Sequence, residues 1–189
     1  MSGLRVISGA ARGRRLKSVP GDSTRPITDR AKESLFNILS SDIADSRFLD
    51  LFAGTGSVGI EALSRGAAYA RFIDKHPQAI KTILANLKST QLEQHAETRR
   101  MDAFKLLLQP ADDRFDYIYI APPQYKRIWK QALHYLDQHP DWLAEAAWVI
   151  VQIHPVEYEE ILLTNLEEFD QRRYGSTILI FYEKTEKDR

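Results

Sequence analysis

The chain has no cysteine, so disulfide bonds and thiolate metal ligands are excluded. It also lacks internal repeats and any apolar run near the roughly 18 residues that a membrane-spanning helix needs. The absence of cysteine and of an apolar signal region near the first residue is typical of a cytoplasmic protein, and we expect that location and no membrane partner. Because the histidines lack metal-ligand spacing, we expect no bound metal; they are His76, His95, His134, His139 and His154.

The amino-acid composition is typical of a folded domain, and its charged residues are distributed unevenly along the chain. Of the 189 residues, 43% are apolar and 28% are charged, which is enough for a substantial core. The formal net charge of zero hides a net charge of +6 on residues 1–32, with eight basic and two acidic side chains, and −6 on the remainder. A basic segment on an acidic body predicts contact with a polyanion such as a nucleic acid. The alternative is a solvated surface that binds no partner.

The order of predicted elements changes near residue 46. Before it, the sequence predicts a short strand over Leu4–Ser8, a basic irregular stretch over 9–15, a turn over 20–23 and a helix that Thr28 caps. After it, strands at 47–52, 69–73, 97–101, 116–120 and 148–153 alternate with helices at 58–64, 78–88, 104–108 and 128–136, and a hairpin over 169–174 and 177–182 follows. This alternation predicts an α/β fold with a mostly parallel sheet, whose ligands bind where the strands end.

A glycine-rich turn follows the first of these strands, within Leu49-Asp-Leu-Phe-Ala-Gly-Thr-Gly-Ser-Val-Gly59. Glycines let the backbone approach a ligand without Cβ collisions, and the N-terminus of the following helix favours an anionic group. Asp50, just before the glycines, suits a ligand with a cationic amine and would repel a pyrophosphate. This favours S-adenosylmethionine over a dinucleotide, and the alternative is an ordinary turn between a strand and a helix.

Two further acids follow the next two strands. Asp74 can accept hydrogen bonds from both hydroxyls of a ribose, and Asp102 can reach an adenine amino group. The alternative role of each carboxylate is to cap the helix that follows it. Because Asp50, Asp74 and Asp102 follow three neighbouring strands, together they predict a ligand site more specifically than any one of them does.

Ordered motifs extend over nearly the whole chain: Arg5-Val-Ile-Ser-Gly9, Arg12-Gly-Arg-Arg-Leu16, Arg25-Pro26, Arg30-Ala-Lys-Glu-Ser-Leu-Phe-Asn37, Leu49–Gly59, Glu61-Ala-Leu-Ser-Arg-Gly-Ala67 and Tyr174-Gly-Ser-Thr177. This set resembles the RsmD family of bacterial 16S rRNA guanine-N2 methyltransferases. The resemblance implies a Rossmann-like class I methyltransferase fold, with a mostly parallel seven-stranded sheet and a C-terminal antiparallel hairpin. It implies S-adenosylmethionine as the methyl donor and the N2 amine of a guanine as the acceptor. The expected partner is 16S rRNA or a small-subunit assembly intermediate, and the expected state is a monomer.

The resemblance also divides the chain and assigns its residues. Residues 1–27 are expected to form a basic N-terminal extension, an RNA-contacting β-hairpin or arm, and residues 28–189 the Rossmann-like methyltransferase domain. The expected cofactor site comprises Asp50, Phe52, Ala53, Gly54, Thr55, Gly56, Asp74, Lys75, Asp102 and Ala103. The expected RNA contacts are Arg12, Arg14, Arg15, Lys17, Arg25 and Arg30, and we expect Arg25, Arg30 and Lys32 to line the path into the active site.

The expected catalytic motif departs from the family pattern. After the fourth strand the family has Asp or Asn, then two prolines and an aromatic residue, whereas this chain has Ala121, Pro122, Pro123, Gln124 and Tyr125. In the family pattern, the side-chain acceptor and a backbone carbonyl hold the guanine amine while the aromatic ring stacks on the extruded base. Because Ala121 removes that acceptor, we expect a variant motif in which Gln124 accepts from the amine and Tyr125 stacks on the base.

Two alternatives to an RNA methyltransferase stay open. Ala121 is compatible with a catalytically impaired, RNA-binding protein that kept the fold, and a methyl-transfer assay separates these two hypotheses. A small-molecule or protein methyltransferase is the other alternative, and the basic N-terminal segment argues against it. The three tryptophans are expected to pack against other side chains rather than serve as platforms for bases; they are Trp129, Trp142 and Trp148.

Overall fold

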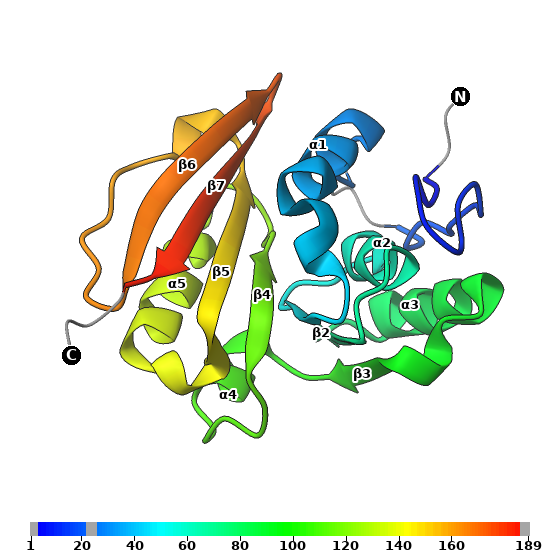
Figure 1. Cartoon of the computed structure of the whole chain (residues 1–189), viewed down its shortest axis with the longest axis horizontal. Coiled ribbons are helices and arrows are strands. Elements are labelled where there is room, and N and C mark those ends of the chain that lie inside the picture. Colours follow the sequence, from blue (N-terminus) through cyan, green and yellow to red (C-terminus); the bar gives the residue numbers. More distant parts are fainter. Residues whose placement is uncertain (1–3, 22–25, 186–189) are drawn as a thin grey trace.

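One seven-stranded β-sheet runs through the computed structural model, which describes residues 4–21 and 26–185 (Figure 1). The strands are β1 (Arg47–Asp50), β2 (Tyr69–Asp74), β3 (Ala96–Arg100), β4 (Phe115–Ile120), β5 (Leu143–Ile153), β6 (Leu166–Tyr174) and β7 (Thr177–Lys184). Their spatial order is β3-β2-β1-β4-β5-β7-β6, with β1 to β5 parallel and β7 antiparallel to both of its neighbours. The predicted α/β fold, with a mostly parallel sheet and a C-terminal hairpin, is confirmed.

In the described part of the chain, five α-helices are arranged around this sheet: α1 (Asp29–Leu39), α2 (Ser57–Ser64), α3 (Pro77–Thr90), α4 (Ala103–Leu107) and α5 (Ile128–Gln138). Short 3-10 turns, η1 (Ser40–Ile43), η2 (Glu93–His95), η3 (Pro140–Trp142) and η4 (Pro155–Glu157), lie between the larger elements. The side chain of Thr28 accepts a hydrogen bond from the backbone N–H of Ala31, so the predicted cap of α1 is confirmed.

The sheet has a hydrophobic core on each face because successive side chains of a strand point to opposite sides. Phe48, Tyr117 and Ile150 pack in one core with α1, α2 and α3. Their neighbours in sequence, such as Leu49 and Ile118, pack in the other core with α4 and α5. Trp129 and Trp142 are buried in this second core and Trp148 packs on Phe169 and Phe181, which confirms their predicted packing roles.

The predicted strand over Leu4–Ser8 is wrong. Only one bridge, between Arg5 and Arg15, forms in this segment. The N–H groups of Ile7 and Ser8 instead donate to the two carboxylate oxygens of Glu61 on α2, at 2.8 and 3.0 Å. A buried carboxylate therefore takes the place of a neighbouring strand as their hydrogen-bond partner.

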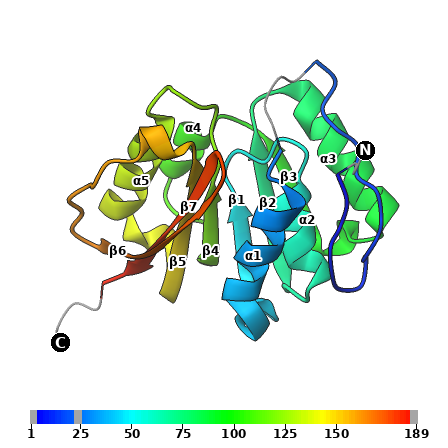
Figure 2. The same cartoon turned by 90° about the horizontal axis from the view of Figure 1, so that it is seen from above.

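The N-terminal segment packs against α2 and α3 (Figure 2). Val6, Ala11 and Leu16 are buried in the same core as α1 to α3, and the N–H of Ala11 donates to Ser64 Oγ at 2.9 Å. The segment is thus fixed to the helices by both apolar and polar contacts. The division of the chain at residue 27 into an extension and a methyltransferase domain stays a prediction.

The last strands are longer than the sequence indicated, since β5 begins at Leu143 and β6 at Leu166. The cause at β6 is Asp137, a buried residue near the end of α5. Its carboxylate accepts from the N–H groups of Thr164, Asn165 and Leu166 at 2.6–3.0 Å, and this directs the chain into the strand. No helix within residues 4–21 and 26–185 combines the length and apolar character that crossing a bilayer demands.

Candidate functional site

The candidate site lies at the edge of the sheet where the parallel strands end. Asp50, the last residue of β1, pairs with Phe72 of β2 on one side and Tyr119 of β4 on the other. The chain runs outward from β1 to β2 and β3, and then returns across β1 to β4. Ligands of open α/β sheets bind at such a reversal of strand order, and the predicted acids and the 121–125 loop all follow strands that end at this edge.

The side chain of Asp50 is buried and only partly satisfied. The backbone N–H groups of Phe52 and Gly59 hydrogen-bond to it, whereas its Oδ1 atom has no hydrogen-bond partner among the described residues. Burial, and then the nearby charge of Asp74, raise the pKa of the Asp50 carboxyl from 3.8 to about 8. A buried acceptor of this kind is completed best by a cation or a strong donor.

Asp74 connects the glycine-rich turn to the start of α3. Its Oδ2 atom accepts from the N–H of Gly54 at 3.0 Å, and its Oδ1 atom accepts from the N–H of His76 at 2.9 Å. Gly54 has a φ of +56°, and a Cβ added there would meet no atom within 4 Å. Open space at Gly54, beside Asp74, is consistent with a close approach of a ligand to the backbone.

The other glycines of the motif have packing roles. A Cβ at Gly59 would lie 2.4 Å from the ring of Phe72, so this glycine lets α2 approach β2 closely. At Gly56, where φ is +78°, a Cβ would meet Ile83 and Phe72 at 3.3 and 3.4 Å. The motif therefore combines one position that faces open space with two that bring the helix onto the sheet.

The remaining predicted cofactor residues are spread between this edge and the two cores. Asp102 caps α4, because its Oδ1 atom accepts from Phe104 N at 2.9 Å and from Lys105 N at 3.4 Å. The ring of Phe52 packs edge-on against Phe104 at 6.4 Å. Ala53 and Ala103 are buried, Thr55 is half-buried, and Lys75 is exposed. The capping role of Asp102 uses one carboxylate oxygen and leaves Oδ2 without a partner among the described residues.

The loop that follows β4 is exposed and has an unusual backbone. Pro122 is buried, Ala121 is half-buried, and Pro123, Gln124 and Tyr125 are exposed. Tyr125 and Arg127 have φ angles of +64° and +53°, a region that residues with a Cβ seldom adopt. The N–H of Tyr125 donates to Glu157 Oε1 at 2.8 Å, and its ring lies 5.9 Å from that of His154. Unfavourable backbone conformations of this kind often occur at functional sites.

The sequence did not single out Asn86 or Glu157, although each helps to hold this site in place. Asn86 is fully buried on α3, and its Nδ2 atom donates to the carbonyls of Thr55 and Lys17 at 2.9 and 3.0 Å. It thereby joins the glycine-rich turn to the N-terminal segment. The sequence did contain a signal for Asn86, because it is a polar residue that stands between the apolar Ile83 and Leu87 on one helix.

The predicted RNA contacts are on the surface where the structure describes them. Arg12, Arg14, Arg15, Lys17 and Arg30 are exposed, and Arg25 lies outside the described residues. Arg14 also donates to the carbonyl of Ser89 at the end of α3, at 3.1 Å. The expectation for Lys32 is wrong, because its side chain is fully buried, with its Nζ atom 3.6 Å from Glu61 and 2.6 Å from the carbonyl of Arg5.

These observations fit S-adenosylmethionine better than a dinucleotide. The buried Oδ1 of Asp50, to which no described residue donates, matches a cationic amine, and the open space at Gly54 would admit a ligand against the backbone. The carboxylate of Asp74, which accepts from the N–H of Gly54 in this turn, would repel a pyrophosphate. The donor set thus agrees with the chemistry of an amino-acid-bearing nucleoside.

The fold is that of the methyltransferases that have a mixed seven-stranded sheet. The solved structure "Putative methyltransferase yhhF from Escherichia coli" matches with a TM-score of 0.84 and 29% identity, over 96% of this chain and 97% of that one. The structure of an RNA methyltransferase from Salinibacter ruber with S-adenosyl-L-homocysteine matches with a TM-score of 0.65 over 87% of this chain and 97% of the other, at 13% identity, a likeness of fold alone.

The chain belongs to the family described as "Conserved hypothetical protein 95", whose model matches residues 4–183, and the predicted membership of the RsmD family is confirmed. The Bacillus subtilis protein named "Putative rRNA methyltransferase YlbH" is 39% identical over 96% of this chain and 99% of its own length. Ribosomal RNA small subunit methyltransferase D of Escherichia coli is 34% identical over 79% of this chain and 74% of its own length.

Proposed function

We propose that this protein transfers a methyl group from S-adenosylmethionine to the exocyclic N2 amine of a guanine in small-subunit rRNA. The observation that carries the proposal is the buried Oδ1 of Asp50, which has no partner within residues 4–21 and 26–185. It lies beside the open position at Gly54, at the point where the strand order reverses. Family membership and the rRNA methyltransferases among the relatives support the same activity.

The residues at the ends of β1, β2 and β3 would hold the donor, which supplies an activated methyl group on a sulfonium. Asp50 accepts a hydrogen bond from the amine of its methionine part, and the backbone at Gly54 lies against the same part. Asp74 accepts from the ribose hydroxyls, and Oδ2 of Asp102 accepts from the adenine amino group. Asp74 and Asp102 keep their structural hydrogen bonds while doing so, because each carboxylate offers about four lone-pair sites.

The loop after β4 would present the guanine. A purine amine is a weak nucleophile, and acceptors that hold its N–H groups orient the nitrogen toward the methyl group. The backbone carbonyls around Pro122 and the amide oxygen of Gln124 are the acceptors in this chain. Tyr125, which is 66% exposed, is available to stack on an extruded base, and the hydrogen bond from its N–H to Glu157 fixes the loop.

The basic N-terminal segment would bind RNA phosphates. Arg12, Arg15 and Lys17 are exposed on a loop that the hydrogen bonds of Glu61, Ser64 and Asn86 hold against α2 and α3. A fixed basic loop loses little conformational entropy when it binds. It therefore positions the RNA as well as attracting it.

A catalytically impaired RNA-binding protein is the alternative, motivated by Ala121. A transfer assay separates the two, with purified protein, S-adenosylmethionine labelled in its methyl group, and either small-subunit rRNA or immature small subunits. We expect label in the RNA at N2 of guanine. Donor binding without label in either substrate would contradict the proposal and favour the alternative.

A further inference from the structure

The tip of the β6–β7 hairpin carries two adjacent arginines, Arg172 and Arg173, near the edge of the sheet that holds the candidate site. We propose that this tip is a second RNA contact, which binds phosphates of the strand whose base the 121–125 loop receives. The proposal rests on the function proposed above. It adds a second place at which the RNA would be held, on the side of the site away from the N-terminal segment.

The register of the sheet places the tip level with the loop. One row of paired residues crosses four strands and consists of Ile120, Val151, Ile180 and Gln171. β6 and β4 run in the same direction. Arg172 and Arg173, which follow Gln171 on β6, therefore lie level with Ala121 and Pro122, which follow Ile120 on β4. The two strands are three spacings apart, about 14 Å at roughly 4.8 Å each. An RNA strand that enters the loop is therefore within reach of the tip through its flanking nucleotides.

The two arginines are exposed and point to opposite faces of the hairpin. Arg172 pairs with Leu179, on the face that carries α1, whereas Arg173 pairs with Ile178, on the face that carries α5. The side chain of Arg172 is 56% exposed, and its Nε and Nη2 atoms contact Asp170 at 3.0 Å. Arg173 Nε donates to the carbonyl of Gly175 at 3.3 Å. Each guanidinium keeps other N–H donors for a phosphate, because arginine has five.

The charge around these arginines confines an RNA contact to the tip. Residues 139–185 contain nine acidic side chains and only three basic ones, of which two are Arg172 and Arg173. The acids of β6 lie toward its start, at Glu167, Glu168 and Asp170. A polyanion would be repelled along the rest of the hairpin and attracted at its end.

The tip is held in place by α1. The hydroxyl of Tyr174 hydrogen-bonds to that of Ser34 on α1, and the half-buried ring of Tyr174 packs against the core beneath that helix. Figure 1 shows the hairpin tip beside the end of α1 that begins at Asp29, and the exposed Arg30 lies in this first turn. A fixed tip presents its guanidinium groups without an added ordering cost.

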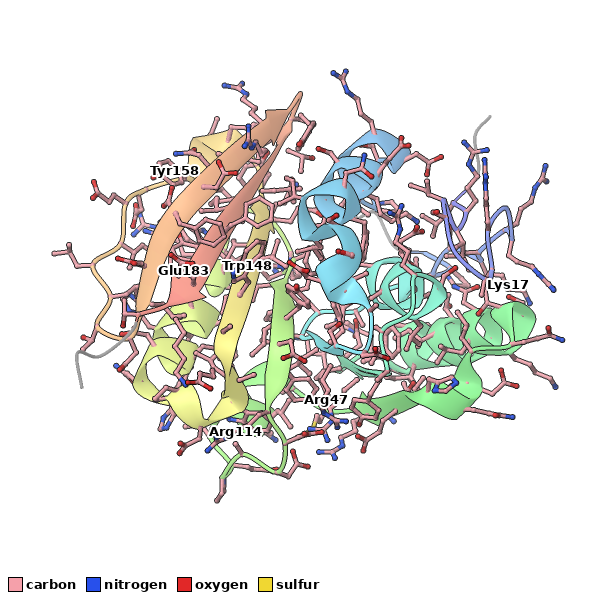
Figure 3. All side chains as sticks on the ribbon, viewed as in Figure 1. Lys17, Arg47, Arg114, Trp148, Tyr158 and Glu183 are labelled. Carbon is pink, nitrogen blue, oxygen red and sulfur yellow. The ribbon has the colours of Figure 1, made fainter. Side chains whose placement is uncertain are left out.

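The experiment compares the double variant Arg172→Gln/Arg173→Gln with wild type in binding to small-subunit rRNA at several salt concentrations. Replacing two contacts to a single strand should make the slope of log K against log salt shallower by about 1.4. Arg114→Gln is the matched control, since Arg114 is exposed and Figure 3 shows it at the opposite end of the molecule from the tip. Arg172→Lys/Arg173→Lys should keep the wild-type slope because the charge is conserved.

Two outcomes separate this proposal from the function on which it rests. A double glutamine variant with the slope of wild type, or one no different from Arg114→Gln, would overturn the RNA contact at the hairpin tip. If the wild-type protein bound the RNA but transferred no methyl group, the proposed function would be contradicted. The salt-dependence slopes of wild type and variants would still test the RNA contact at the hairpin tip. Binding of S-adenosylmethionine should be equal in all variants, which checks that each remains folded.

Discussion

Among single residues, the proposed donor site depends most on the carboxyl of Asp50. Burial and the neighbouring Asp74 raise its pKa to about 8, so the free protein holds it largely protonated at neutral pH. The cationic amine of the donor would bind the ionised form. The fraction of ionised Asp50 therefore limits the apparent affinity for the donor.

We predict that the dissociation constant of S-adenosylmethionine falls as the pH rises from 6 to 8. The expected fall is about 20-fold, for a carboxyl that ionises near pH 8 and a donor amine that begins to lose its proton in the same range. Asp50→Asn should bind the donor weakly and without this pH dependence. Calorimetric titration at several pH values measures both, and the exposed Asp141→Asn is the control. A wild-type affinity that does not change between pH 6 and 8 would count against the role of Asp50.

The same carboxyl affects the stability of the free protein. Because its folded pKa is above its unfolded value of about 3.9, the protein is stabilised below pH 4 relative to pH 8, and stability is lost as the pH rises through that window. Asp50→Asn should remove this part of the pH dependence and be the more stable protein above pH 8. Denaturant titration at pH 5 and pH 9 provides the comparison.

Gln124 is the second residue that can be tested singly. If its amide oxygen accepts from the guanine amine, Gln124→Ala should lower kcat by about 10²-fold with little change in KM. Ala121→Asn, which restores the family's acceptor, should recover activity in that background. Gln131→Ala, an exposed change on α5, controls for surface effects. An unaltered kcat in Gln124→Ala would show that the backbone carbonyls suffice.

At the scale of elements, Glu61 of α2 joins three parts of the chain. Its fully buried carboxylate accepts from the N–H groups of Ile7 and Ser8 and from Arg65 Nε, and lies 3.6 Å from Lys32 Nζ on α1. The N-terminal loop, α1 and α2 therefore share one charged centre. Removing the carboxylate would leave Lys32 buried without its counter-charge.

We predict that Glu61→Gln destabilises the protein by about 3–5 kcal/mol. Denaturant unfolding measures the change, and the exposed Glu33→Gln on α1 is the control. The apolar replacement Lys32→Met in the Glu61→Gln background should regain part of the loss, because it removes the unpaired buried charge. Equal stability of Glu61→Gln and Glu33→Gln would show that the N-terminal loop is held by its apolar contacts alone.

The contrast between Asp50 and Glu61 indicates what the sequence could predict. Strand and helix periodicity predicted the sheet, and an acid before a glycine-rich turn placed the candidate site at the edge where the parallel strands end. Glu61 and Asn86 were not predicted because their partners are backbone groups of Ile7, Ser8 and Lys17, more than 50 residues away. Leu4–Ser8 likewise has the composition of a strand but forms only an isolated bridge, between Arg5 and Arg15. Lys32 has the appearance of a surface charge in the sequence, although its side chain is buried.

At the scale of the whole molecule, charge is separated along the chain and in space. The first 32 residues carry a net charge of +6, and Figure 3 shows Lys17 of this segment on the side of the molecule away from the hairpin strands. The rest of the chain carries −6. An rRNA substrate would therefore approach with its phosphates toward the basic loop.

We predict that Arg12→Gln/Arg15→Gln/Lys17→Gln makes the salt dependence of RNA binding shallower by about 2 in the slope of log K against log salt. The charge-conserving Arg12→Lys/Arg15→Lys should keep the wild-type slope. Filter binding at four or more salt concentrations suffices for the comparison. If the triple variant kept the wild-type slope, the basic loop would not contact phosphates.

The proposed activity is tested best by locating the methyl group that this protein adds. Mass spectrometry of small-subunit rRNA from cells with and without the gene for this chain compares every modified guanine at once. We predict that one N2-methylguanine is lost with the gene and returns with the wild-type protein but not with Asp50→Asn. An identical set of methylated guanines in both rRNAs would contradict it.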